Sequence, residues 1–323
     1  MARYVVTGGL PEAARSLYPP GPAFEFLGPD PADRPSLLEE LGEAEGLLCM
    51  LIDQVDEVLL DSAPRLRVVS QMAVGVDNID VASCTARRIP VGHTPDVLTE
   101  TTADTALALL LASLRRIPEG QDLVRAGHWR QWSLDLLTGE DLHGSTVGII
   151  GLGRIGEAIA RRLAGFGVRM LYTGPSRKAS LESELKIGYR EVGELLAESD
   201  HVILSASLNP STRRLIDEAA LNAMKSGATL VNIARGGLVD HDALASALAS
   251  GRIGRAALDV TDPEPIPADH PLVSMPNCIV IPHIGSASVR TRLAMATRAV
   301  ENLAAGLEGR PLQWCVNPEV YSS

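Results

Sequence analysis

The first hundred residues alternate short apolar runs with segments of helical spacing. Apolar runs predict β-strands at 4–8, 23–27, 46–51 and 67–71. The segments between them predict helices at 11–18, 35–45 and 56–64, because they combine apolar positions three or four apart with proline or acidic starts. Strands that alternate with helices are typical of βαβ units and of a parallel sheet.

A second alternating series begins near residue 146. It predicts strands at 146–151, 168–173, 201–207, 228–234, 255–260 and 278–282, followed by a helix across 291–309. We therefore expect an α/β protein with two doubly wound parallel-sheet domains. A domain of residues 99–286 would be inserted into a smaller, flavodoxin-like domain formed by 1–98 and 287–323.

The segment 98–117 between the two series is rich in Ala and Leu. Acidic residues and threonines crowd its start and two arginines its end, which matches the helix dipole. The pattern predicts a single long helix. A helix this apolar is buried, either between domains or at an oligomer interface.

Composition narrows the classes of function. The 323 residues are 46% hydrophobic, enough for two domain cores, and the net charge of −11 argues against a general surface for nucleic acid or anionic membranes. Cys49, Cys84, Cys278 and Cys315 lie far apart, which favours reduced thiols in the cytoplasm and no structural metal. The apolar runs are too short for a signal peptide or a membrane span, so we expect a cytoplasmic protein.

The sequence GIIGLGRIG places Gly151, Gly153 and Gly156 directly after a predicted strand and at the start of an amphipathic helix. Glycines there let the backbone approach a pyrophosphate, and the helix N-terminus supplies N–H donors and positive potential. The motif alone also fits a plain tight turn. In this strand–turn–helix context it predicts a Rossmann dinucleotide site, which limits the chemistry mostly to hydride transfer.

The predicted cofactor is NADPH, with NADH as the weaker alternative. Domains specific for NAD place an acid about 20 residues after the glycines, on the ribose 2′-hydroxyl. No Asp or Glu occurs across 158–181, and the second strand is followed by Ser176, Arg177 and Lys178. These cations suit a 2′-phosphate. The alternative is a solvated basic turn.

Arg235, Glu264 and His283 each follow a late predicted strand, at the edge where open α/β sheets place their ligands. Glu264 lies in the segment DVTDPEPIPADHP between two prolines, which stiffen the backbone. Taken singly, each residue has a non-functional interpretation. Arg235 would be a surface charge, Glu264 part of a solvated connector and His283 a structural histidine. Their shared position favours a functional site.

In order and spacing, the motifs VGVDNID, GLGRIG, NIARGG, LDVTDPEP and PHIGSAS resemble those of the D-isomer-specific 2-hydroxyacid dehydrogenases, and within them the glyoxylate/hydroxypyruvate reductases. The likeness runs nearly from end to end. It implies that Arg235, Glu264 and His283 form the catalytic set. Glu264 would hydrogen-bond His283 and favour its imidazolium form, so that His283 can protonate a carbonyl oxygen while Arg235 binds the substrate carboxylate.

The resemblance also implies further contacts. Val74 and Gly75 of the smaller domain would complete carboxylate binding, so that domain closure assembles the site, and Ser286 would join them. Asp259 would orient the nicotinamide carboxamide, with a solvated strand end as its alternative. The implied cofactor set is Gly151, Gly153, Arg154, Ile155, Gly156, Ser176, Arg177, Lys178, Ser207, Ile233, Asp259 and Gly285.

We therefore expect a homodimer that reduces glyoxylate and hydroxypyruvate to glycolate and D-glycerate, with the helix 98–117 and its neighbours at the interface. Relatives place an aromatic that reaches a partner's pocket within the stretch matching 128–139, where Leu136 is a candidate replacement. A dehydrogenase for another small D-2-hydroxy acid and a dinucleotide-sensing corepressor stay as alternatives. A formate dehydrogenase is disfavoured, because that relative carries Gln at the position of Glu264.

Overall fold

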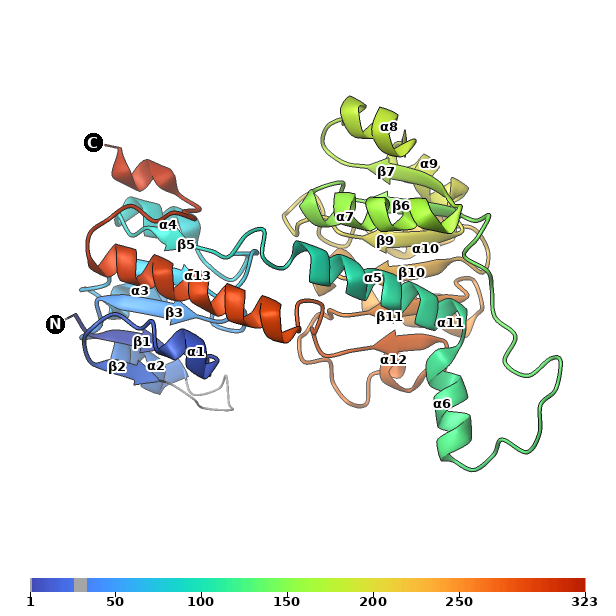
Figure 1. The fold of residues 1–323 in the computed structure, drawn as a ribbon, viewed down its shortest axis with the longest axis horizontal. Coiled ribbons are helices and arrows are strands. Elements are labelled where there is room, and N and C mark those ends of the chain that lie inside the picture. The colour runs from blue at the N-terminus through green and yellow to red at the C-terminus, as the bar shows by residue number, and fades with distance from the viewer. Residues whose placement is uncertain (1, 26–33, 323) are drawn as a thin grey trace. The chain divides into compact units, whose positions relative to one another are not determined.

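The computed structural model describes residues 2–25 and 34–322. Contacts within it divide the chain into two compact units, Met1–Leu98 with Ala287–Ser323, and Thr99–Ser286 (Figure 1). The second unit is thus inserted in sequence between the two parts of the first. No helix in the described part of the chain has the length and apolar character needed to cross a membrane.

Over its described residues, the first unit contains a five-stranded parallel sheet in the order β2-β1-β3-β4-β5. This is the flavodoxin-like order. The strands are β1 Tyr4–Val6, β2 Ala23–Glu25, β3 Gly46–Cys49, β4 Val68–Gln71 and β5 Val91–Gly92. The helices are α1 Glu12–Arg15, α2 Arg34–Leu41, α3 Glu57–Ser62, α4 Val81–Ala86 and α13 Val289–Leu307, with a 3₁₀ turn at Pro318–Tyr321.

Helix α13 packs on β3 and β4, while α2, α3 and α4 pack on the other face of the same sheet (Figure 1). The C-terminal part of the chain therefore completes the core that the N-terminal part begins. The last two residues of the predicted strand 23–27 lie outside the described residues. The short elements α4 and β5 have no counterpart among the predicted elements.

The second unit contains, in its described residues, a seven-stranded parallel sheet in the order β12-β11-β10-β9-β6-β7-β8. Its strands are β6 Thr146–Ile150, β7 Arg169–Thr173, β8 Gly188–Tyr189, β9 His201–Leu204, β10 Thr229–Asn232, β11 Arg255–Leu258 and β12 Cys278–Val280. Its helices are α5 Thr99–Leu114, α6 Ile117–Arg125, α7 Arg154–Leu163, α8 Ala179–Leu185, α9 Val192–Glu198, α10 Glu218–Ala223, α11 His241–Ala249 and α12 Pro271–Ser274, with 3₁₀ turns at Ala164–Phe166 and Gly236–Leu238.

This strand order is the Rossmann order with one additional strand. The chain runs outward from β6 to β8 and then returns to place β9 on the other side of β6. Helices α5 and α7 cover one face of the sheet, and α9, α10 and α11 cover the other (Figure 1). The direction of winding therefore reverses between β6 and β9, where such sheets open a crevice at the strand ends.

The single helix predicted across 98–117 is wrong. Helix α5 ends at Leu114, Arg116 has φ of +53°, and α6 begins at Ile117 with Pro118 in its first turn. The break has a physical cause, because the Pro118 ring clashes with the carbonyl four residues earlier in a continuous helix. The apolar side chains of α5 are buried against α7, β10 and β11 of the same unit, so the core of that unit accounts for them.

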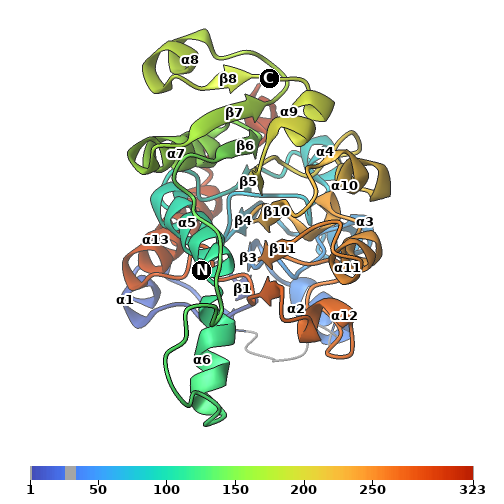
Figure 2. The same ribbon diagram turned by 90° about the vertical axis from the view of Figure 1, so that its right-hand side faces the viewer.

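Helix α6 projects from the body of the second unit, and the chain returns from it as a long loop (Figures 1 and 2). We refer to residues 117–139 as the arm. Several large apolar side chains of the arm are at least 40% exposed: Ile117, Val124, Trp129, Trp132, Leu134 and Leu136. The arm is fastened at its base, where Glu119 is ion-paired with Arg116 and, at 3.1 Å, with Arg255.

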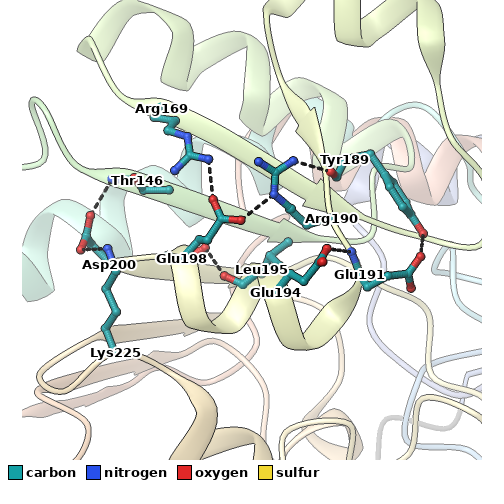
Figure 3. A network of polar contacts seen from close by, with 11 residues as sticks. Thr146, Arg169, Tyr189, Arg190, Glu191, Glu194, Leu195, Glu198, Asp200 and Lys225 are labelled. Atoms are coloured by element: carbon teal, nitrogen blue, oxygen red, sulfur yellow. Dashed lines mark hydrogen bonds and ion pairs between the residues drawn. The ribbon is translucent and has the colours of Figure 1, made fainter.

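A polar network fixes the ends of the Rossmann sheet at which β6 and β9 begin (Figure 3). Asp200 accepts hydrogen bonds from the Thr146 amide and from Lys225 Nζ, both at 2.7 Å. Glu198 at the end of α9 accepts from Arg169 and from Arg190. These contacts join β7 to α9 and β6 to the connection between α9 and β9. The opposite, carboxyl ends of the strands carry the predicted site residues.

Candidate active site

The glycine-rich turn connects β6 to α7 and packs tightly on two sides. Gly151 has φ of +97°, and a Cβ there would lie 2.6 Å from the Ala206 nitrogen. A Cβ on Gly156 would lie 2.1 Å from the Gly151 oxygen. Ser205, after β9, donates from Oγ to that same oxygen at 2.6 Å. Glycine is required at both positions because no side chain fits between the turn and its neighbours.

Gly153 has the opposite environment. A Cβ there would meet no atom within 4 Å, and Gly153 precedes the first residue of α7 without a capping side chain. The turn thus presents open backbone at a helix N-terminus, beside the point where the sheet order reverses. N–H donors and the helix dipole favour an anion at such a place. The residues present therefore fit the pyrophosphate of a dinucleotide.

The basic turn lies at the end of the neighbouring strand β7. Ser176 and Arg177 are exposed and Lys178 is half-buried. Arg177 is not a freely solvated cation, because it forms an ion pair with Glu182 of α8. This acid lies one residue beyond the acid-free stretch 158–181 and is absent from the sequence interpretation.

Three further loops leave the adjacent strands β10, β11 and β12. These strands run in parallel register, with Asn232 beside Leu258 and Leu258 beside Val280. Neighbouring strands lie about 5 Å apart. The loops that carry the three predicted catalytic residues therefore begin side by side at the carboxyl edge of the sheet.

Glu264 and His283 are in direct contact. Nδ1 of His283 lies 2.7 Å from Oε1 of Glu264, and the His283 and Glu264 side chains are 27% and 37% exposed. Because an ionised carboxylate only accepts, the imidazole donates its Nδ1–H to Glu264. The hydrogen bond implied by the resemblance is present.

Asp259 shapes the turn that carries His283. Its carboxylate accepts from the amide of Ile284 at 2.7 Å and from that of Gly285 at 2.9 Å, while its own carbonyl accepts from the His283 amide at 2.9 Å. Asp259 is only 2% exposed, so its interpretation as a solvated strand end is wrong. Burial raises the pKa of this carboxyl, against the two amide bonds, which lower it.

His283 has φ of +51°, a left-handed conformation that is uncommon for a residue with a side chain. Backbone strain of this kind persists where the surrounding structure imposes it. The three bonds to Asp259 impose it here. Thr105 of α5 adds a fourth restraint by donating from Oγ1 to the Gly285 carbonyl at 3.0 Å.

Arg235 lies in the loop after β10, directly before the 3₁₀ turn at Gly236–Leu238. The buried side chain of Asn232 donates to the Arg235 carbonyl at 2.8 Å and accepts from the Ala234 amide at 3.0 Å. Arg235 itself is half-buried, and its Nη1 donates to the Ala234 carbonyl at 2.8 Å. Its local backbone is therefore set by a side chain at the strand end.

The Arg235 loop touches the Glu264 loop through backbone. A Cβ on Gly236 would lie 1.9 Å from the carbonyl carbon of Thr261, so only glycine permits this approach. The structure thus brings Asp259, Glu264, His283 and Gly285 together by direct contacts and places Arg235 on an abutting loop. Sequence reasoning missed Asn232, Gly236 and Thr105, whose roles depend on tertiary contacts.

The other predicted residues lie at the same edge of the second unit or in the first unit. Ile233 is 5% exposed, Ser207 is exposed after β9, and Ser286 is half-buried after Gly285. Val74 and Gly75 lie in the loop after β4 of the first unit. No described residue accepts a hydrogen bond from the amide of Val74 or Gly75.

That loop is held by buried polar side chains. Gln71 donates to the Gly75 carbonyl at 3.3 Å and to Oδ1 of Asn78 at 2.7 Å. Asn78 in turn donates to the Asp53 carbonyl at 2.7 Å, and the Asp53 carboxylate accepts from Met50 and Thr7. Burial raises the pKa of Asp53, and the Thr7 hydroxyl and Met50 amide partly offset that rise.

Comparison with known proteins identifies the family of the chain. Residues 107–285 match the model of the D-isomer specific 2-hydroxyacid dehydrogenase NAD binding domain. The chain is 47% identical over 285 residues to a human protein named glyoxylate reductase/hydroxypyruvate reductase, covering 88% of this chain and 87% of that protein.

Solved structures give the same result. The TT0316 protein from Thermus thermophilus is 44% identical, with a TM-score of 0.89 over 97% of this chain and 99% of that one. An NADPH-dependent glyoxylate/hydroxypyruvate reductase from Sinorhizobium meliloti, solved with NADP and malonate, is 33% identical with a TM-score of 0.86 over 98% and 97%. The chain belongs to the D-isomer-specific 2-hydroxyacid dehydrogenase family. It is an NAD(P)-dependent oxidoreductase whose relatives include glyoxylate and hydroxypyruvate reductases.

Proposed function

We propose that the protein is an NADPH-preferring reductase of glyoxylate and hydroxypyruvate, giving glycolate and D-glycerate. The observation that carries the proposal is the Glu264–His283 hydrogen bond, held at the strand edge by Asp259 and abutted by the Arg235 loop. A proton donor beside a guanidinium is what the reduction of a 2-oxo acid requires, because the substrate has one carbonyl and one carboxylate.

In this proposal, a bound nicotinamide would supply the hydride. Arg235 binds the substrate carboxylate and orients the adjacent carbonyl. His283 holds a proton on Nε2 and delivers it to the carbonyl oxygen, while Glu264 accepts from Nδ1 and stabilises the imidazolium. The amides of Val74 and Gly75, which donate to no described residue, would bind the carboxylate as well. Ser286 joins the substrate contacts.

Two regions of the second unit would bind the phosphate groups of the dinucleotide. Gly151, Gly153 and Gly156 would hold the pyrophosphate, together with the Arg154 and Ile155 amides in the first turn of α7. Ser176, Arg177 and Lys178 would hold a 2′-phosphate. Ser207, Ile233, Asp259 and Gly285 would contact the remainder of the dinucleotide. Both oxygens of Asp259 already accept backbone amides, so any carboxamide contact would share them.

The proposal also includes a homodimer and a cytoplasmic location. The exposed apolar side chains of the arm would be covered by a second copy of the chain, since patches of this kind mark interaction sites. All four cysteines are free thiols, as is typical of a reducing compartment.

Replacing the proton donor tests the reaction. We expect His283→Ala to lower kcat/KM on glyoxylate and on hydroxypyruvate roughly 10²–10⁴-fold, because general acid catalysis contributes about that much. Cofactor binding should persist, and Arg235→Ala should likewise lose most turnover. Steady-state kinetics with NADPH give the answer. Near-wild-type rates in either variant, or a wild type inactive on both substrates, would contradict the assignment.

Removing the charge of Glu264 tests its role. Glu264→Gln keeps the shape and a hydrogen bond but no longer favours imidazolium, so reduction should fail at a lower pH than in the wild type. The sign follows because the reaction consumes the protonated form, whose population falls as pH rises. The measurement is kcat/KM against pH. An unshifted profile would mean that Glu264 is structural.

Removing the basic turn tests the cofactor. Arg177→Ala with Lys178→Ala should raise KM for NADPH far more than KM for NADH. The double substitution removes two charge-assisted contacts to the phosphate. Because Arg177 is exposed and ion-paired, we expect a modest effect, about 10–100-fold. Equal effects on both cofactors, or a wild type that favours NADH, would overturn this part of the proposal.

Charging the arm tests the dimer. The wild type should sediment at about twice its monomer mass of 34.3 kDa, and Trp132→Glu with Leu134→Glu should shift it toward the monomer because buried charges oppose association. Val289→Glu is the matched control, since Val289 is 91% exposed and lies outside the arm. A monomeric wild type would refute the expectation.

A further inference from the structure

The cation expected to meet a 2′-phosphate is already paired. Arg177 donates from Nε to Oε1 of Glu182 at 3.1 Å and from Nη2 to Oε2. Its guanidinium also lies over the Tyr189 ring, 5.6 Å from the ring centroid. A guanidinium has five N–H donors, so this pairing leaves three for another anion.

Glu182 is held more firmly than its partner. The hydroxyl of Tyr172, a buried side chain of β7, donates to Oε1 of Glu182 at 2.7 Å. That hydroxyl also accepts from the Lys178 amide at 2.7 Å, so one group fixes both the acid and the basic turn. Glu182 is 17% exposed and Arg177 is 66% exposed. The acid therefore lies beneath the cation, and the cation faces solvent.

The aromatic platform under Arg177 is itself fixed. Tyr189 packs edge-on against Tyr172, with the ring centroids 5.4 Å apart. Its hydroxyl donates to Glu191 at 3.0 Å, and its carbonyl accepts from Arg190, which Glu198 holds in turn (Figure 3). Arg177 is therefore positioned by two rigid neighbours, one of them a carboxylate.

An acid in the first turn of a helix has an ordinary explanation, because carboxylates favour the N-terminal end of the dipole. That explanation does not account for the direction of Glu182, whose carboxylate faces Arg177 and Tyr172. The same contacts lower the pKa of Glu182, with the Arg177 bond as the largest cause. The carboxylate is thus charged throughout the neutral range.

We infer that Glu182 is a specificity residue that limits the preference for NADPH over NADH; this inference rests on the proposed use of Arg177 for the 2′-phosphate. The Arg177–Glu182 pair has no net charge. A phosphate bound to the N–H groups of Arg177 that do not contact Glu182 would be separated from the Glu182 carboxylate only by the guanidinium, and the two negative charges would repel each other. The repulsion opposes NADPH and leaves the neutral ribose hydroxyl of NADH unaffected. Glu182 therefore narrows the difference between the two cofactors.

The test is equilibrium binding of NADP⁺ and NAD⁺ by titration calorimetry. Glu182→Gln should lower the dissociation constant for NADP⁺ about tenfold, the effect expected for a carboxylate and a phosphate separated by one guanidinium in a water-like dielectric. The dissociation constant for NAD⁺ should change much less. Glu184→Gln is the matched control: Glu184 lies on the same helix and is ion-paired with Arg161 instead. It should change neither cofactor selectively. In an Arg177→Ala background, Glu182→Gln should give no selective gain.

An unchanged or weakened affinity for NADP⁺ relative to NAD⁺ would overturn the inference, as would an equal gain in Glu184→Gln or a gain that persists without Arg177. Glu182→Ala gives the same loss of charge without a new amide, and decides the matter if the Gln variant binds neither cofactor. A different result would contradict the proposed use of Arg177 itself: Arg177→Ala would weaken the binding of both cofactors equally. A selective loss in Arg177→Ala with a silent Glu182→Gln would remove only the inference.

Discussion

The site depends on one buried carboxylate, Asp259. It follows strand β11 and ties down the turn after β12 by accepting the amides of Ile284 and Gly285. These bonds help to hold the left-handed backbone of His283, whose imidazole contacts Glu264. A carboxylate buried among backbone amides is costly to lose, since each amide would be left unpaired. The pairing of β11 with β12 therefore sets the position of the Glu264–His283 pair.

Other polar side chains at the carboxyl edge of the Rossmann sheet also hold loops, as Asp259 does. Asn232 ends β10 and organises the Arg235 loop, and Ser205 follows β9 and braces the glycine turn. Tyr172 on β7 holds both Glu182 and the basic turn. In each case a polar side chain at or near a strand end hydrogen-bonds a neighbouring loop, so rigid strands position residues that act on ligands. The candidate catalytic residues lie on loops, and side chains at the strand ends fix the conformations of those loops.

Much of this could be predicted from the sequence, because strand periodicity, the glycine turn and three residues after late strands are local patterns. The two parallel sheets and the Glu264–His283 contact followed from them and from the family resemblance. The break before Pro118 has a local cause, the proline itself, which the prediction did not use because it carried the helix up to the residue before the proline. Local patterns could not give the pairing of Arg177 with Glu182. That pairing depends on a turn that brings residues five apart into contact. The buried role of Asp259 likewise appears only once β11 and β12 are adjacent.

The central claim is that the loops after β10, β11 and β12 form a site for a 2-oxo acid. A crystal structure of the protein with NADP⁺ and oxamate, a non-reducible analogue, tests it most directly. We expect the oxamate carboxylate on the Arg235 guanidinium and its carbonyl oxygen within hydrogen-bond distance of Nε2 of His283, with Nδ1 still on Glu264. Oxamate bound away from His283, or a His283 turned from Glu264 in the complex, would contradict the claim.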